Sequence, residues 1–372
     1  MPAAPRPARG RRPEQLPALP LAVPPAVSMP ATIPPERATP CSDPFDDDGW
    51  RFSVDWEGAR TLLSVDEAGT LRLTAENGLD VTARYPELRF ASEHVQLLPA
   101  ALDGVVVTLD PQGRPDLEGL GLRVALEDRG AAQRSVVFLA TDLLFAGVEP
   151  TVGRPLSDRL ALLGQLVGHR GIVQAPDTVE GRGAGLAEAA GQRGLSAVLA
   201  RRAAAPYRSG VASPDRLQIA LRPRATCVIV GIEDGADRPY LLLGEQDAGR
   251  LAYSGRVKGP RHAAVEQWMA ARAATLATLD PNLTGAPLRR FSTAGDCVWL
   301  RPGICATVSH EGRLKDGTLR EPALIAVRDD VDPGWCVRRD PVPPPARTAR
   351  SFSPTVLLPL PLDAFGDSGP VP

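Results

Sequence analysis

The pattern that most constrains the fold is a succession of short apolar runs of strand length, separated by Gly, Asp and Pro. In the first half of the chain these runs cover 51–54, 60–65, 71–74, 102–110 and 135–145. The turn Asp66-Glu67-Ala68-Gly69 joins two of them and supplies a glycine for a positive φ. Runs of this length bounded by turn residues indicate antiparallel strands.

Two helices are expected among these strands. Ser157 precedes apolar residues at helical spacing and is a residue type that caps helix N-termini, which predicts a helix over 157–163. A second helix is expected over 185–193, and strand character returns over 195–201 and 217–221. The first folded unit is therefore expected to be a mixed α+β domain that ends near residue 223.

A second, β-rich unit is expected to follow. Its apolar runs cover 227–232, 240–244, 250–257, 297–300 and 304–308, with a helix expected over 262–279. Five short strands around one helix fit an OB-fold barrel. The strand count alone allows an SH3-like barrel equally well.

Both ends of the chain differ in composition from its middle. Residues 1–46 are rich in Pro, Ala and Arg, and residues 341–372 are rich in Pro. Such segments bury too little apolar surface to offset the entropy of ordering. We predict disordered tails at 1–46 and 341–372, and two domains at 47–223 and 224–340; a length of 372 residues accommodates both.

Charge and cysteine usage exclude several classes of protein. The formal net charge of −2 argues against strong sequence-independent attraction to a phosphate backbone, and Lys258 and Lys315 are the only lysines. The five cysteines form no C-x-x-C pair and the four histidines show no ligand spacing, so no metal site or disulfide framework is expected. No apolar run reaches the roughly 18 residues of a membrane helix, and prolines interrupt the N-terminal segment. We expect a cytoplasmic protein without a membrane partner.

A series of short motifs runs through both expected domains. The first is Trp50–Arg60, an apolar strand that leads into Asp55-Trp56-Glu57-Gly58-Ala59-Arg60. The others are Asn77–Leu88, Leu102-Asp103-Gly104, Thr141–Leu144, Pro206-Tyr207 with Gly210 and Ser213, Gly255-Arg256-Val257, Asp316–Pro322 and Arg328-Asp329-Asp330. In order and spacing they resemble the signature motifs of the ATP-dependent DNA ligases, in particular the bacterial end-joining type. This resemblance spans roughly residues 29–335. It implies an α+β fold, with a nucleotidyltransferase-like (ATP-grasp-like DNA ligase) domain followed by a β-barrel OB-fold domain.

The resemblance also shows that the family's chemical groups are replaced. Asp55 stands where the family has the lysine that attacks the α-phosphate of ATP, and a carboxylate cannot supply that amine. A carboxylate there also opposes the triphosphate, by about 4 kcal/mol for a unit pair at ~4 Å and an effective dielectric of about 20. The other replacing residues are Val105 and Ser196 for two glutamates, Gln218 and Ala220 for two lysines, Thr141 for an aromatic residue and Val331 for a lysine.

The sequence therefore predicts a catalytically inactive ATP-dependent DNA ligase homologue that acts as a DNA-binding or accessory protein in DNA repair. By resemblance, Arg60 is a remnant of the nucleotide-binding site, and Arg320 and Arg328 are candidate DNA contacts. ATP and Mg²⁺ are implied by the resemblance alone, and no cofactor is otherwise expected. The expected partners are nicked or double-stranded DNA and repair proteins.

Two alternatives stay open. The chain is a functional ligase that seals nicks by an atypical route, or it is a protein-interaction scaffold without a nucleic-acid role. The near-neutral charge and the Pro-rich ends, which suit extended recognition segments, favour the scaffold.

Overall fold

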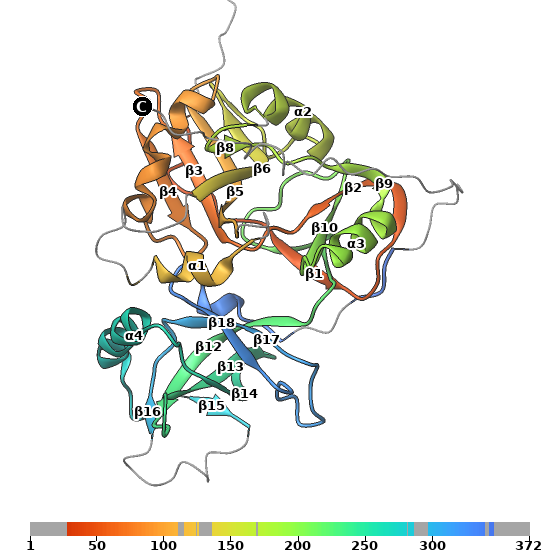
Figure 1. Ribbon diagram of the computed structural model, residues 1–372. Helices are drawn as coiled ribbons and strands as arrows, with labels where there is room; N and C mark the ends of the chain where they lie inside the picture. The colour runs from red at the N-terminus through yellow and green to blue at the C-terminus, as the bar shows by residue number, and fades with distance from the viewer. Residues whose placement is uncertain are drawn as a thin grey trace, which may run out of the picture.

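The computed structural model describes residues 28–110, 115–123, 125, 136–168, 170–280, 282–285, 297–338 and 342–345, which form two lobes (Figure 1). The first lobe contains two sheets. In spatial order the first sheet consists of β1 (Arg37–Cys41), β11 (Ala212–Ala220), β10 (Ala197–Arg202), β2 (Asp46–Val54) and β9 (Val179–Arg182). The second sheet consists of β4 (Leu71–Ala75), β3 (Ala59–Val65), β5 (Ala100–Thr108), β6 (Val136–Ala146) and β7 (Glu149–Pro150), with β8 (Val173–Gln174) also paired to β6.

Alternation along the strands gives the first sheet an apolar outer face and a more polar inner face. Val198 and Ala200 of β10 pack in one buried cluster with Leu217 and Ile219 of β11. Helix α3 (Gly183–Gln192) covers this face and adds Leu186 to the cluster. Because successive side chains of a strand point to opposite faces, the intervening residues of β10 and β11 point towards the second sheet.

The second sheet is covered on its outer side by helical segments. These are α2 (Leu156–Leu166), the 3₁₀ segments η1 (Thr82–Arg84) and η2 (Pro86–His94), and the short helix α1 (Leu117–Leu122) at its lower edge (Figure 1). Leu163 of α2 and Leu88 of η2 are buried in one cluster with Leu63 and Leu102 of the sheet. This cluster is the main core of the first lobe.

The second lobe is a separate sheet closed by one helix. Its strands are, in order, β15 (Leu283–Thr284), β14 (Arg250–Lys258), β13 (Tyr240–Asp247), β12 (Arg224–Glu233), β17 (Cys305–Ser309) and β18 (Ala323–Arg328), with β16 (Cys297–Trp299) on β12. Helix α4 (Ala263–Leu276) buries Val265, Met269 and Ala273, spaced four residues apart, against this sheet. The N–H of Leu319, in the segment before β18, donates to the carbonyl of Ser254 on β14 at 2.8 Å. This bond joins the segment before β18 to a strand near the other end of the strand order.

The second lobe docks on the first through β18 and the segment after it, which includes the 3₁₀ segment η4 (Pro333–Trp335). Arg84 of η1 forms a bidentate ion pair with Asp329, with both N–O distances 2.6 Å. The side-chain amide of Asn77 donates to the carbonyl of Asp329 at 2.6 Å. The guanidinium of Arg37 lies 4.9 Å from the ring centre of Trp335. These contacts hold the second lobe across the open side of the first.

The expected disordered tails are too long. Strand β1 pairs in parallel with β11 although it lies inside the expected tail 1–46. At the other end Val342 donates its N–H to the carbonyl of Pro40 at 2.9 Å and bridges to Cys41. Backbone hydrogen bonds to an existing sheet edge order these segments, although they have little apolar surface of their own. Residues 1–27 and 346–372 of the expected tails lie outside the described residues.

The three expected helices begin and end near the expected positions, with one correction, whereas α1, η1 and η2 were not expected. Helix α2 starts at Leu156 after Pro155, so Ser157 lies in its first turn and does not cap it. Pro155 fixes the entry of the chain in place of a capping side chain. No helix in the described part of the chain has the length and apolar character needed to cross a membrane.

Candidate functional site

A pocket of about 420 Å³ lies between the two sheets of the first lobe and is closed on one side by the second lobe. The first sheet contributes Ala197, Leu199, Arg216, Gln218 and Ala220, and the second contributes Arg60, Val105 and Thr141. The second lobe contributes Thr307, Arg328, Val331 and Trp335–Val337. Every replaced position identified in the sequence therefore lines this one pocket: Asp55, Val105, Thr141, Ser196, Gln218, Ala220 and Val331.

Asp55 follows the last residue of β2, where the chain crosses from the first sheet to β3 of the second. Gln218 of β11 donates from its side-chain amide to a carboxylate oxygen of Asp55 at 2.5 Å. Two residues further on, Glu57 forms an ion pair with Arg224 at 2.6 Å. Both carboxylates near the crossing thus have protein partners, and neither partner is a lysine.

Arg60 belongs to a buried polar network on the second sheet. Its guanidinium binds both carboxylate oxygens of Asp103 on β5, at 3.1 and 2.7 Å, and lies 3.9 Å from Glu76. The Tyr207 hydroxyl donates to Asp103 at 3.0 Å and accepts from the N–H of Glu36 at 2.9 Å. Burial acts to raise the pKa of Asp103, but Arg60 outweighs it and the pKa is lowered. Arg60 therefore lies at the pocket wall, where it neutralises a buried carboxylate.

The two predicted DNA contacts have different environments. Arg328, at the end of β18, is 8% exposed, forms a bidentate ion pair with Asp330 at 2.6 Å and lines the inter-sheet pocket. Arg320 is exposed and bonds the carbonyl of Glu311. The structure does not bring these two arginines together on one surface.

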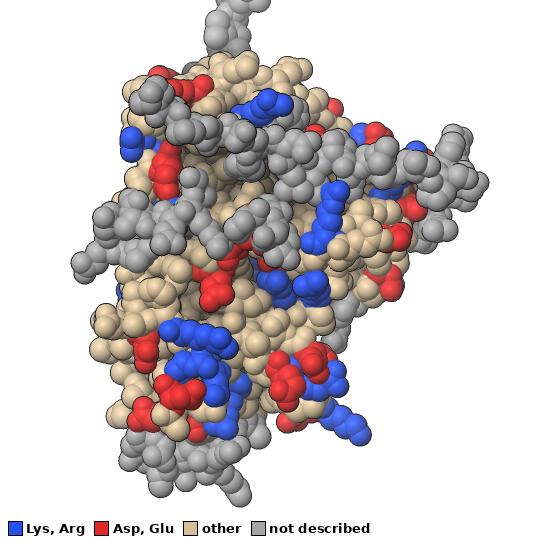
Figure 2. Space-filling model, in the orientation of Figure 1, with Lys and Arg blue, Asp and Glu red and all other residues tan. Residues whose placement is uncertain are grey.

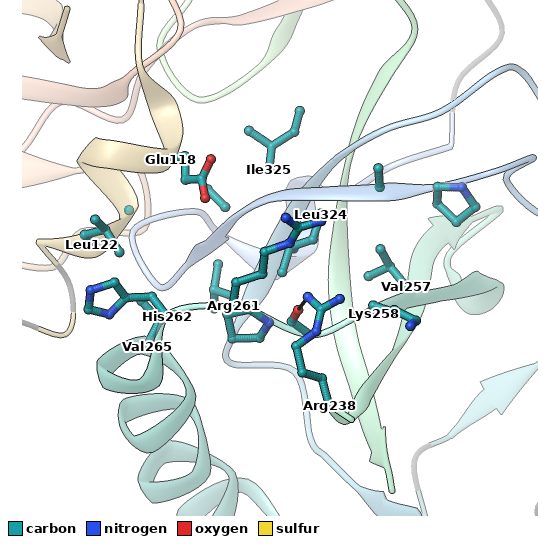
Figure 3. A pocket seen from close by; sticks show the side chains of 17 residues that line it. Glu118, Leu122, Arg238, Val257, Lys258, Arg261, His262, Val265, Leu324 and Ile325 are labelled. Carbon is teal, nitrogen blue, oxygen red and sulfur yellow. Dashed lines mark hydrogen bonds between the residues drawn. The ribbon is translucent and has the colours of Figure 1, made fainter. Parts of the chain in front are cut away.

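Neither lysine lies in the inter-sheet pocket. Lys258 lines a second cavity of about 480 Å³ between α1 and the second lobe, together with Arg238 and Arg261 (Figure 3). Its ammonium lies 3.2 Å from Asp237. Lys315 is exposed on the loop between β17 and β18.

Sequence reasoning missed Arg216 and Trp335, which both line the pocket. For Arg216 a signal existed, because it alternates with the apolar Leu217 and Ile219 and so shares a strand face with Gln218. Trp335 lies on η4 after the last strand, and no periodicity marks it.

These residues do not fit adenylyl transfer from ATP. The described wall contains no lysine, and the residue at the crossing is a carboxylate already bonded to Gln218. The described wall therefore offers no lysine amine to such a transfer. Among the residues that the structure describes, no group of three or more His, Cys, Asp or Glu side chains is placed to hold a metal ion.

Comparison with known proteins agrees with this architecture. Residues 238–331 match the family model for the "ATP dependent DNA ligase C terminal region". The chain is 30% identical over 335 residues to the "Multifunctional non-homologous end joining protein LigD" of Pseudomonas aeruginosa, covering 87% of this chain and 39% of that protein. It is 29% identical over 296 residues to the "Multifunctional non-homologous end joining DNA repair protein LigD" of Mycobacterium tuberculosis strain H37Rv, covering 78% and 37%. The chain thus spans less than half the length of these curated relatives.

Among solved structures, the chain is similar to "mycobacterial DNA ligase D complexed with ATP and MES". The TM-score is 0.57 at 26% identity, with 82% of this chain and 98% of that chain covered. Two facing sheets, a pocket between them and a β-rich second lobe across its mouth define a nucleotidyltransferase-like domain joined to an OB-fold domain. These similarities support placing the chain in the ATP-dependent DNA ligase family.

Replacing Arg60 by Met is expected to lower the free energy of unfolding at pH 7.5 by about 3 kcal/mol, because Asp103 stays buried without its bidentate partner. In the wild type, the lowered pKa makes this stabilisation present above the usual Asp value of 3.8 and lost as the pH falls through the lowered value. Without Arg60 the pKa of Asp103 rises, so the deficit of the variant should shrink between pH 7.5 and 4.5. Urea denaturation at both pH values measures it.

The matched control for this experiment is the double variant Arg60→Met with Asp103→Leu. It removes the stranded carboxylate and should recover most of the lost stability. A deficit that is equal at the two pH values, or that the second substitution leaves unchanged, would contradict the buried-pair explanation.

Proposed function

We propose that this chain is a ligase-family protein that has lost nucleotidyl transfer and binds DNA as an accessory protein in end-joining repair. In this proposal the nucleotidyltransferase-like domain extends from residue 37 to about 223 and the OB-fold domain from 224 to 338. The role in end joining is suggested by the two relatives, which are named as non-homologous end joining proteins. The bond between Asp55 and Gln218 carries the proposal, because it fills the position of the attacking lysine with a paired carboxylate.

The second lobe offers a surface for the DNA backbone. Lys and Arg side chains gather on this lobe beneath α1, with Asp and Glu beside them (Figure 2). Arg238, Lys258 and Arg261 line the cavity there, and Arg261 and the separate Arg320 are exposed. Lys and Arg at such a surface neutralise phosphates and release counterions, which makes binding salt-dependent. Arg328 is buried and paired with Asp330. In this proposal it stabilises the docking of the second lobe on the first.

DNA affinity tests this proposal. The wild type should retard a nicked duplex in a gel at low salt and release it as the salt concentration rises. Arg261→Ala and Arg320→Ala should each weaken binding several-fold and reduce the salt slope by about 1, the effect of one lost phosphate contact. Electrophoretic mobility shift measured at several salt concentrations gives both quantities.

Arg193→Ala is the matched control, since Arg193 is an exposed arginine at the end of α3 on the outer side of the first lobe. It should bind DNA as the wild type does. An unretarded duplex would reject the DNA-binding proposal and favour the scaffold without a nucleic-acid role. Equal losses in all three variants would reject the proposed surface.

A further inference from the structure

Two buried arginines lie side by side on the inner face of the first sheet. Arg216 of β11 and Arg201 of β10 are direct cross-strand partners, so their side chains leave the same face of the sheet. They are 6% and 4% exposed. Like charges directly opposite one another on a sheet are destabilising, and burial adds the cost of removing each charge from water. Such a pair requires negative charge close by.

The buried carboxylates near this pair are already engaged. Asp142 binds Arg159 through both oxygens, at 2.7 and 2.9 Å, and also lies 3.5 Å from Arg201. Asp103 is held in the same way by Arg60. Arg201 gains one more bond, to the carbonyl of Thr141 at 2.8 Å, and burial lowers its pKa to about 10. Arg201 therefore stays charged at neutral pH, and Asp142 and the carbonyl of Thr141 are its partners.

Arg216 does not have such partners among the described residues. Its Nε and Nη1 atoms are buried and make no hydrogen bond there. Two acids are close enough to act on it. Glu36 is buried and bonded to Ser213, and burial raises its pKa; Asp103 also acts on Arg216, but Arg60 already binds both of its oxygens. Buried polar nitrogens almost always have a hydrogen-bond partner, and an unpaired buried guanidinium is expensive. Arg216 also lines the inter-sheet pocket, so a ligand in that pocket lies against this side chain.

We infer that the inter-sheet pocket binds a small anion, a carboxylate or a phosphate monoester, through the guanidinium of Arg216. The planar fork of a guanidinium binds two oxygens of such a group at once. The pocket volume of about 420 Å³ lies in the range of small-molecule sites and leaves room for the body of the ligand.

The wall also limits the charge of this ligand. Asp55 and Glu57 line the same pocket at the crossing between the sheets. Arg224 neutralises Glu57, but the partner of Asp55 is the uncharged amide of Gln218. A second negative group that extended to Asp55 would be repelled, so a ligand with a single anionic group is favoured over a triphosphate. The inference does not depend on DNA binding or on the loss of adenylyl transfer, and it stands or fails separately from both.

Inorganic phosphate and acetate are suitable probes, each titrated at constant ionic strength set with NaCl. At about ten times its dissociation constant, an anion that binds only the folded chain shifts the folding equilibrium about tenfold. The melting temperature of the wild type should rise by a few degrees with at least one probe. Calorimetric titration should show one site per chain.

Arg216→Met keeps the length of the side chain and removes its charge. Without probe it should melt at or above the wild-type temperature, because no unpaired guanidinium remains buried, and the probe should no longer raise it. Arg222→Met is the matched control, since Arg222 lines the same pocket but is exposed at its rim, and it should respond as the wild type does.

Each result decides the inference. A response to phosphate alone identifies phosphate monoesters, a response to acetate alone identifies carboxylates, and a response to both identifies the shared chemistry. No response in the wild type overturns the inference, and so does an equal response in Arg216→Met. A melting temperature of Arg216→Met well below that of the wild type in NaCl alone would show that protein groups already pair Arg216, and would overturn it as well.

Discussion

Incubation with radiolabelled ATP and Mg²⁺, followed by denaturing electrophoresis, is expected to leave this chain unlabelled. Ligase-type adenylyl transfer needs a neutral amine at the α-phosphate, and the crossing between β2 and β3 presents Asp55 instead. The described residues of the pocket wall include no lysine that could take its place. Without the nucleophile no covalent bond to the nucleotide forms. We therefore expect no radiolabel on this chain under conditions in which an active family member is labelled.

Two variants separate the missing nucleophile from the other replacements. Asp55→Lys alone is expected to stay unlabelled, because Val105, Ser196, Gln218 and Ala220 leave the pocket without the acids and lysines that the family places there. A five-site variant carries Asp55→Lys, Val105→Glu, Ser196→Glu, Gln218→Lys and Ala220→Lys. It is expected to recover label, since all five positions line the same pocket. An active ligase domain run in parallel verifies the assay.

A labelled wild-type band would overturn the proposed loss of nucleotidyl transfer and favour the atypical ligase. Peptide mapping of the labelled protein would then identify the acceptor residue. In that case the gel-shift experiment would still test DNA binding and the anion titration would still test anion binding, because neither depends on the adenylation result.

Replacing Arg159 by Ala is expected to cost about 3–5 kcal/mol of unfolding free energy, the largest stability effect among the substitutions considered for this chain. Arg159 of α2 is 2% exposed and binds both oxygens of Asp142, itself 1% exposed, at 2.7 and 2.9 Å. It also donates to the carbonyls of Arg154 and Ala205, at 2.6 and 3.1 Å. Truncation leaves a buried carboxylate and two carbonyls without this partner. Urea denaturation followed by circular dichroism measures the loss.

Two controls define this result. Arg154→Ala removes an exposed ion pair with Glu149 in the same segment and should leave stability within the error of the measurement. The double variant Arg159→Met with Asp142→Leu removes both charges of this pair and should recover part of the stability lost in Arg159→Ala; the remaining loss falls on Arg201, which lies 3.5 Å from Asp142 in the wild type. If Arg159→Ala cost no more than Arg154→Ala, the pair would not act as a buried one.

Much of the architecture follows from local pattern. The strand character of 195–201 and 217–221 predicted strands, and β10 and β11 include most of these stretches because their apolar residues share one buried face. The loss of the attacking amine at Asp55 was equally readable, since it depends on one residue type at one motif position. The ends were predicted less well, because Arg37–Cys41 is ordered by pairing with a strand about 170 residues away, which composition does not encode.

The succession of strands and helices, the family motifs and the aspartate at the crossing follow from the amino-acid sequence alone, since they depend on residue type and short-range spacing. Which charged side chains meet follows from the fold and not from local spacing. Gln218 reaches Asp55 across 163 residues, Arg60 pairs with Asp103, and Arg216 comes to lie beside Arg201 in a pocket closed by Trp335. A charged side chain acquires its partner and its burial from sheet register and lobe docking, which combine distant segments. For that reason the buried guanidinium of Arg216, two of whose nitrogens have no hydrogen-bond partner among the described residues, is visible only in the fold.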